Sequence, residues 1–362
     1  MKKTNNKKRQ QSALLANIIF SLVALFALTV AVIFILSNHA LQNKLTMVEN
    51  ENQELNEYKQ EYKYTKEDMD HLEVRVREEE NETEKNLLLD QIKETMDNGY
   101  SAYYLLRSLF PNDVVVMSNG SFNFFEITDS LKKNNYVLDN FLKVEDSNEI
   151  QYVDDNNNLL SHKGIDISSH NGEIDFEKVK NSGVEYVMIR VGFRGSTEGG
   201  LVLDSTFEDN IKGANKAGLK VGVYFYTQAV NVEEAKEEAQ FVLDAIEPYN
   251  VNYPVVFDLE KYEGESRASG LSSEQYTDCA IAFMDTIKAA GYMPMIYGNL
   301  NTFFLMLDLN RLENYEKWFA YYIYPVYFPY DFAIWQYTSE GKVDGIDGNV
   351  DLNISMKTLS SE

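Results

Sequence analysis

From residue 163 onwards, short apolar segments alternate with longer amphipathic ones, and this alternation restricts the fold more than any other feature of the chain. The apolar segments are rich in β-branched and aromatic residues, which favour strands, and the stretches between the early ones have helical length and pattern. Strands that alternate with helices form parallel sheets. The sequence therefore predicts a parallel α/β barrel, with little or no helix between its last three strands.

The expected strands and helices can be placed by residue number. We expect strands at residues 164–168, 186–192, 220–226, 253–260, 293–298, 317–322, 332–337 and 350–354, and helices at 176–182, 205–217, 232–246 and 273–290. Because the last strands lack helices between them, the barrel should be irregular on that side.

The fourth expected strand ends in two carboxylates, Asp258 and Glu260, with one apolar residue between them. Side chains alternate along a strand, so both acids face the same side, and their carboxyl groups should lie about 5 to 7 Å apart. Glycoside hydrolysis uses such a pair: one acid protonates the leaving oxygen, and the other stabilises or attacks the sugar. Since like charges this close cannot both ionise freely, one pKa should be raised. The same pattern also occurs at solvated strand ends, so the assignment of a catalytic pair depends on other residues of the chain.

In parallel barrels, side chains at the carboxyl ends of the strands meet at one mouth. The residues that the sequence places there are Asp166, Arg190, Tyr224, Tyr226, Asp258, Glu260, Tyr297, Gln336 and Asp351. The four acids come from three different strands, which is rare for structural acids. We expect Arg190 to pair with Asp166 or Asp258 and hold it ionised. Tyr297 and Trp335 could stack on a sugar or serve packing alone.

Seven motifs in this region resemble, in the same order, those of glycoside hydrolase family 25, the bacterial and phage lysozymes that act as N-acetylmuramidases. They are GIDISSH from residue 164, YVMIR from 186, GVYFY from 222, PVVFDLE from 254, IYGN from 296, WQYT from 335 and VDLN from 350. Together they cover essentially the whole region from residue 161 to the end of the chain.

The resemblance implies an irregular eight-stranded (β/α) barrel with Glu260 as general acid. Asp258 would stabilise the developing charge or orient the substrate acetamido group as internal nucleophile, and Asp166 and Asp351 would line the same pocket. The residues expected to bind substrate are Arg190, Tyr224, Tyr226, Tyr297, Trp335 and Gln336; no metal and no cofactor are expected. One departure is Phe225, where many members carry a histidine, and this could alter how the sugar or the carboxylates are bonded.

The function expected from these residues is cleavage of the β-1,4 bond between N-acetylmuramic acid and N-acetylglucosamine in peptidoglycan. We expect retention of configuration, because the space between Asp258 and Glu260 is too narrow for the attacking water of an inverting mechanism, which needs about 6.5 to 9.5 Å. One alternative is a catalytically silent protein that binds or scaffolds cell-wall glycan. Another is a chitinase-like enzyme, although the D-x-x-D-x-D-x-E signature of that group is absent from residues 253–260.

The first part of the chain has the features of a membrane anchor. Residues 13–36 contain no charge and are long enough to cross a hydrocarbon core of roughly 30 Å. Five basic residues precede this span, which predicts a cytoplasmic tail at residues 1–12 and an extracellular location for everything beyond the span. A cleaved signal peptide is the competing interpretation, but the apolar run is too long and no convincing cleavage site follows it.

Two further segments separate the expected anchor from the barrel at residues 161–362. Residues 37–98 are charged and helical in composition, with apolar residues at intervals of seven, which fits either a weak coiled coil that forms a homodimer or a single helical stalk. Residues 99–160 form a small α+β module with a hairpin turn at Asn119 and Gly120. The net charge of −24 disfavours nucleic acid, and a single cysteine, Cys279, excludes disulfides within the chain.

Overall fold

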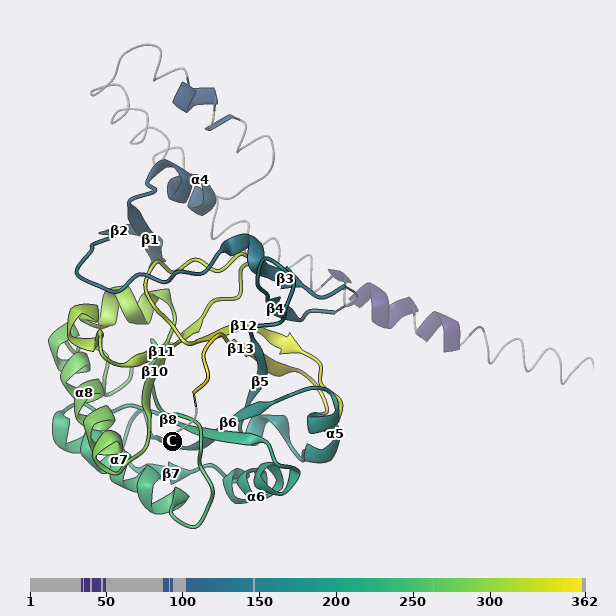
Figure 1. Ribbon diagram of the computed structural model, residues 1–362, viewed down its shortest axis with the longest axis vertical. Coiled ribbons are helices and arrows are strands. Elements are labelled where there is room, and N and C mark those ends of the chain that lie inside the picture. Colours follow the sequence, from purple (N-terminus) through teal and green to yellow (C-terminus); the bar gives the residue numbers. More distant parts are fainter. Residues whose placement is uncertain are drawn as a thin grey trace, which may run out of the picture. The chain divides into compact units, whose positions relative to one another are not determined.

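The computed structural model describes residues 34, 36–39, 41–46, 48–49, 87–90, 92–93, 102–145, 147–262 and 264–359 (Figure 1). The chain divides into two compact units, Met1–Leu106 and Arg107–Glu362. The predicted tail, and most of the predicted anchor and stalk, lie outside the described residues. Among the described residues, no helix has both the length and the apolar character that a membrane span requires.

Eight strands of the second unit close into a barrel, which confirms the predicted fold class. They are β5 (His162–Ile167), β6 (Tyr186–Arg194), β8 (Lys220–Tyr226), β9 (Val255–Asp258), β10 (Pro294–Gly298), β11 (Glu316–Ala320), β12 (Ile334–Gly341) and β13 (Val350–Ser355). The first seven run parallel in chain order, and β5 pairs with both β6 and β13 to close the sheet. A short additional strand, β7 (Leu201–Leu203), pairs with β6 outside the closed barrel.

The last strand, β13, is antiparallel to both of its neighbours. Residues 342–349 connect it to β12 without a helix, and a parallel arrangement would need a crossover connection of a dozen or more residues. The expectation that Asp351 stands at the carboxyl end of a parallel strand is therefore wrong. Asp351 is the second residue of β13, and it reaches the same mouth because the strand runs the other way; its register partner is Asp166.

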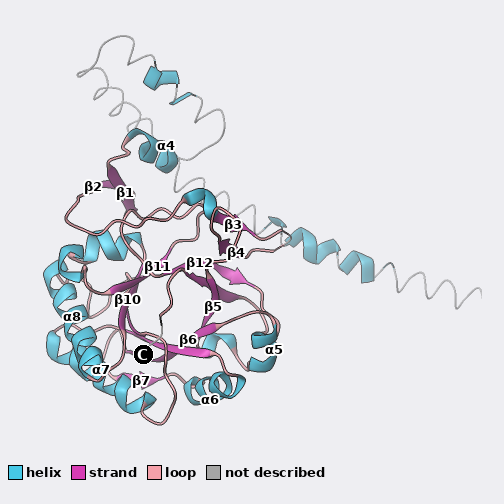
Figure 2. Ribbon diagram, in the orientation of Figure 1, coloured by secondary structure: helices cyan, strands magenta, loops and turns pink. Residues whose placement is uncertain are grey.

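The four predicted helices cover the outside of the barrel (Figures 1 and 2). They are α5 (Phe176–Asn181), α6 (Phe207–Ala217), α7 (Val232–Ile246) and α8 (Ser273–Ala289). The side chain of Asn231 caps α7, and Ser272 and Gln275 form a capping box on α8. After α8, the helical elements of the described chain are a π-helical turn, η3 (Thr302–Met306), and one short 3-10 turn.

The interior of the barrel below the mouth is apolar. Inward-facing side chains from five strands fill it, and they include Tyr186, Met188, Val256, Met295, Trp318 and Ile334. The carboxyl groups of the strands therefore lie above this layer, at the end of the barrel where the strands open.

Residues 107–160 form two hairpins and the connections between them. The helix α4 (Ala102–Leu109) is followed by β1 (Asp113–Ser118) and β2 (Ser121–Glu126), then by η1 (Leu138–Asn140), β3 (Phe141–Lys143) and β4 (Ile150–Tyr152). The predicted turn joins β1 and β2, with positive φ angles of 51° at Asn119 and 74° at Gly120. These angles suit asparagine and glycine, which explains the tight connection.

These hairpins share a buried surface with the barrel. The ring of Phe141 is fully buried and stands perpendicular to Trp335, with ring centroids 5.3 Å apart. The hydroxyl of Tyr136 donates to the carbonyl of Phe332 at 2.7 Å, and the hydroxyl of Tyr327 donates to the carbonyl of Asp113 at 3.0 Å. Residues 107–160 therefore cover part of the outer wall of the barrel.

Two further 3-10 turns complete the second unit. They are η2 (Ser169–Asn171), directly after β5, and η4 (Leu309–Leu312), directly before β11. The turn η2 matters for the mouth because it places Ser169 beside the second strand.

Candidate active site

Four carboxyl groups lie at the mouth of the barrel, as the sequence predicted. Asp166 is on β5, Asp258 is the last residue of β9, and Glu260 follows two residues later, just beyond the strand. Asp351 enters from β13. Asp166 and Asp258 are buried, with exposed fractions of 7% and 4%. Burying a carboxylate this deeply costs free energy unless it accepts hydrogen bonds or takes up a proton.

The amide of Gln336 links two of these acids to two tyrosines. Its nitrogen donates to Asp166 Oδ2 at 2.8 Å and to Asp351 Oδ2 at 3.4 Å. Its oxygen accepts from the hydroxyls of Tyr297 and Tyr322, both at 2.8 Å. Because the two hydroxyls donate to the oxygen, the amide nitrogen is fixed toward the carboxylates.

A second amide, Asn353, supports Asp166 from below. Its nitrogen donates to Asp166 Oδ2 at 2.7 Å, and its oxygen accepts from the indole nitrogen of Trp318 at 2.7 Å. An indole nitrogen can only donate, so the orientation of this amide is fixed as well. Asn353 lies two residues after Asp351 on β13 and thus faces the same side, a signal in the sequence that the prediction of the site did not use.

The carboxyl groups raise one another's pKa values. Burial raises the pKa of Asp166 well above its ordinary value, and the negative charge of Asp351 adds to this, while Asn353 and Gln336 act in the opposite direction. Burial likewise raises the pKa of Asp258, with a further contribution from Glu260. Burial, and then Asp351, raise the pKa of Glu260. The mouth therefore retains protons at a pH where exposed carboxyl groups have lost them.

Arg190 does not pair with Asp166 or Asp258, so that expectation is wrong. Its guanidinium donates to Asp204 Oδ2 at 2.8 Å and to Ser169 Oγ at 3.0 Å. Asp204 follows the short strand β7, which the sequence did not predict. The positive charge of Arg190 nevertheless opposes the rise in the pKa of Asp258.

Asp258 has an oxygen without a partner. Its Oδ1 atom is buried and accepts no hydrogen bond from the described residues. A buried acceptor without a donor costs about 1 to 3 kcal/mol. Among the described residues, no donor therefore stabilises a negative charge on this oxygen.

The tyrosines of β8 face the mouth, whereas Phe225 between them faces away. Tyr224 and Tyr226 are partly exposed, and burial, followed by the charge of Glu260, raises the pKa of Tyr226. Phe225 is fully buried against Phe241 of α7, with ring centroids 5.8 Å apart. The departure at Phe225 thus concerns the layer between strand and helix and leaves the mouth unchanged.

Trp335 does not join the mouth residues. Its side chain is fully buried on the outer wall, and its indole nitrogen donates to the carbonyl of Tyr321 at 2.7 Å. A fully covered ring cannot stack on a sugar, so we expect Trp335 to hold the wall together. Tyr297 is also buried, but its hydroxyl lies within the mouth and donates a hydrogen bond to the amide oxygen of Gln336.

A comparison with protein families identifies this domain. A model described as "Glycosyl hydrolases family 25" matches residues 165–346, half of the chain, and the match includes Asp166, Asp258 and Glu260. The chain belongs to glycosyl hydrolase family 25. Within the described part of this family 25 chain, no group of three or more histidine, cysteine, aspartate or glutamate side chains could hold a metal ion.

The family 25 region is similar to several known proteins. It is 32% identical over 193 residues to the autolytic lysozyme of Clostridium acetobutylicum, covering 53% of this chain and 55% of that protein. It is 25% identical over 202 residues to lysozyme M1 of Streptomyces globisporus, covering 53% and 66%. The chain thus spans little more than half the length of the first of these relatives.

A solved structure has a similar fold over a larger part of the chain. The modular autolysin LytC of Streptococcus pneumoniae matches with a TM-score of 0.50 and 25% identity, covering 67% of this chain and 56% of that one. A second structure of LytC contains a synthetic peptidoglycan ligand, with the same TM-score, identity and coverage.

Proposed function

We propose that this family 25 protein hydrolyses the β-1,4 bond between N-acetylmuramic acid and N-acetylglucosamine in peptidoglycan. The observation that carries the proposal is the convergence of Asp166, Asp258, Glu260 and Asp351 on one mouth, with raised pKa values for all four. Similarity to proteins named as lysozymes and to LytC, which has been solved with a peptidoglycan ligand, supports this substrate class.

Glu260 acts as the general acid in this proposal. Its raised pKa keeps a proton on the carboxyl group, and its position just beyond β9 leaves it partly exposed, so that it can reach a leaving oxygen and regain a proton from water. Asp258 is more deeply buried and its pKa is also raised, so in the free protein the proton is shared between the two acids.

Substrate binding determines which of Asp258 and Glu260 carries the proton. The acetamido group of the substrate carries an N–H donor, and the unpartnered Oδ1 of Asp258 would accept it. A hydrogen bond to the ionised form lowers a pKa, so Asp258 becomes the carboxylate and Glu260 keeps the proton. Asp258 then orients the acetamido oxygen toward the anomeric carbon, and a substrate-assisted reaction of this kind retains configuration.

The test is release of reducing ends from purified peptidoglycan. Glu260→Gln should lower the rate by about 100 to 10,000-fold, because it removes the donatable proton at nearly constant shape. Retention of more than a tenth of the activity would remove Glu260 from the acid role. If the wild-type protein bound peptidoglycan but released no reducing ends, the silent glycan-binding alternative would hold instead.

We also propose that the protein is anchored in a membrane by residues 13–36, with the barrel on the outer side. The support is the uncharged span and the basic residues before it. Protease treatment of intact cells should remove the barrel while leaving a short membrane-bound fragment; a barrel that stays protected would contradict this orientation.

The apolar heptad positions between residues 37 and 98 support a homodimer through a parallel coiled coil. Cross-linking through a cysteine introduced at Val48 would produce a covalent dimer of the full chain. A chain that remains monomeric under these conditions would favour the single helical stalk.

A further inference from the structure

A cavity of about 580 Å³ adjoins the acid mouth and includes Glu260 in its lining. This volume lies in the range typical of small-molecule sites, about 300 to 1,000 Å³. One wall comes from the β1–β2 hairpin, which contributes Ser118, Asn119, Ser121 and Asn123. The hairpin lies outside residues 165–346, so the matched family region does not form this cavity alone.

The hairpin is held to the barrel at the tip of its turn. The ammonium group of Lys261, next to Glu260, donates to Asn119 Oδ1 at 2.8 Å. This contact joins the hairpin to the loop between β9 and α8, one residue from Glu260. Lys261 is exposed, so this contact lies at the rim of the cavity and not in the core of the barrel.

The lining contains two buried acceptors without donors. Gln228 is only 3% exposed, yet its Oε1 atom accepts no hydrogen bond from the described residues, and the same holds for Oδ1 of Asn301. Both residues line the cavity. Unpartnered buried acceptors are costly, and a ligand with N–H or O–H donors would satisfy them.

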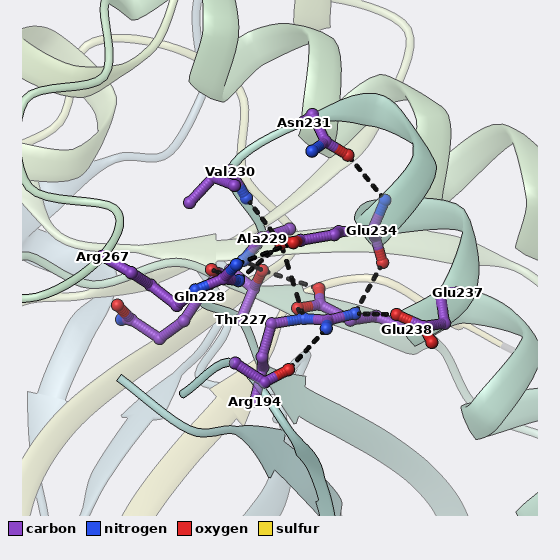
Figure 3. A network of polar contacts seen from close by, with 11 residues as sticks. Arg194, Thr227, Gln228, Ala229, Val230, Asn231, Glu234, Glu237, Glu238 and Arg267 are labelled. Carbon is purple, nitrogen blue, oxygen red and sulfur yellow. Dashed lines mark hydrogen bonds and ion pairs between the residues drawn. The ribbon is translucent and has the colours of Figure 1, made fainter. Parts of the chain in front are cut away.

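Gln228 is held in place by a network of charged residues (Figure 3). Arg267 donates to the carbonyl oxygen of Gln228 at 3.1 Å while its other nitrogen donates to Glu234 at 2.7 Å. On the other side, the hydroxyl of Thr227 donates to Glu238 at 2.7 Å. The backbone of Gln228 is therefore fixed on both sides, and its side chain is presented at the cavity lining by a rigid support.

The chemistry of the cavity indicates a neutral polar ligand. Of the described residues that line it, only Glu260 and Lys261 are charged, and about half of the others carry hydroxyl or amide groups. Tyr262 and Tyr276 add aromatic surface. Hydroxyls, amides and aromatic rings are the groups that bind a sugar, whereas the charged stem peptide of peptidoglycan would need charged partners.

We propose that this cavity binds the sugar on the leaving-group side of the scissile bond, with the β1–β2 hairpin as one wall. The inference rests on the proposed function, in which Glu260 protonates the leaving oxygen. A sugar attached to that oxygen must lie beside Glu260, and this cavity lies there. Residues that precede the barrel then take part in substrate binding.

Binding to an inactive protein tests the proposal without hydrolysis. In full-length Glu260→Gln protein, calorimetry would measure the affinity for a peptide-free tetrasaccharide of alternating N-acetylglucosamine and N-acetylmuramic acid. Gln228→Met and Asn119→Gly should each weaken binding by about tenfold, since one hydrogen bond to a neutral ligand is worth roughly that factor. Asn119→Gly keeps the left-handed turn, and Glu126→Ala, an exposed position on the same hairpin that does not line the cavity, is the matched control.

Kinetics on two substrates separates binding from a purely structural role. In the active protein, the variants should lower kcat/KM for the tetrasaccharide about tenfold relative to kcat/KM for an aryl chito-oligoside, whose leaving group is a phenol without a sugar. An equal loss on both substrates, or unchanged binding of the tetrasaccharide, would overturn the proposal. A loss that appears only with glycans carrying stem peptides would assign the cavity to the peptide instead. A wild-type protein that hydrolyses neither substrate would refute the proposed function, while the calorimetry still decides whether the cavity binds the sugar.

Discussion

Replacing Glu238 with glutamine should make the stability of the barrel less dependent on pH. Glu238 lies on α7 with no exposed surface, and it accepts hydrogen bonds from Arg194 at 2.7 Å and from Thr227 at 2.7 Å (Figure 3). Burial raises its pKa from an ordinary value of 4.5 to about 7 despite these donors. Between these two values the unfolded chain releases a proton that the folded chain keeps. The free energy of unfolding therefore falls as pH rises through this interval.

The size of this effect follows from the shift. A rise from 4.5 to about 7, at 1.36 kcal/mol per pKa unit, corresponds to about 3 kcal/mol of stability lost on going from pH 4.5 to pH 8. Asp166 and Asp258 add losses of the same sign, since their pKa values are also raised. These losses are common to wild type and variant, so they cancel in the comparison.

Urea denaturation of wild type and Glu238→Gln at pH 4.5 and pH 8 would measure the difference. The decline in unfolding free energy should be smaller in the variant by about 3 kcal/mol. Glu237→Gln is the matched control, because Glu237 contacts the same Arg194 at 2.7 Å but its side chain is 59% exposed. Equal pH dependence in wild type and Glu238→Gln would refute the buried, raised pKa of Glu238.

Three other predictions concern the mouth and the outer wall. Asp258→Asn should abolish turnover, and proton NMR of the wild-type product should show the β-anomer first; an initial α-anomer would mean that water attacks from across the cleft. Asn353→Leu removes a donor to Asp166, so it should lower the unfolding free energy by about 1 kcal/mol more at pH 8, where Asp166 is more ionised, than at pH 4.5, and equal losses would contradict this. Phe141→Ala should cost about 3 to 5 kcal/mol in urea denaturation and shift the fluorescence of Trp335 to the red, whereas an unchanged midpoint would show that the two do not share a core.

The parts of the fold that depend on local patterns could be predicted from the sequence. The strands show as β-branched runs, and the turn at Asn119 and Gly120 needs two positive φ angles that these residues adopt. Asp166 and Asp258 could be placed at the mouth because parallel strands bring their carboxyl ends together. In each case a short segment contains the information.

The features that the sequence analysis missed depend on which distant segments lie side by side. The partner of Arg190 is Asp204, which is positioned by a three-residue strand too short to recognise. Tyr322 reaches Gln336 from just beyond β11, which ends at Ala320 although the strand was expected to continue to residue 322. The antiparallel direction of β13 is an exception. It could have been predicted locally, because residues 342–349 are too short a connection for a parallel crossover.

The hydrogen-bond donors in the mouth are unevenly distributed among the four acids, and this imbalance bears on the proposed reaction. Asp166 accepts from both Gln336 and Asn353, which stabilise its negative charge, whereas Oδ1 of Asp258 accepts from none of the described residues. The raised pKa values of Asp258 and Glu260 lie on the side where the proposed reaction needs an acid. An acetamido N–H bound at Asp258 would supply the missing donor and leave the proton on Glu260. In the proposed reaction, a substrate without an acetamido group would leave that proton shared, so N-acetylated sugars would be favoured through the protonation state of the mouth.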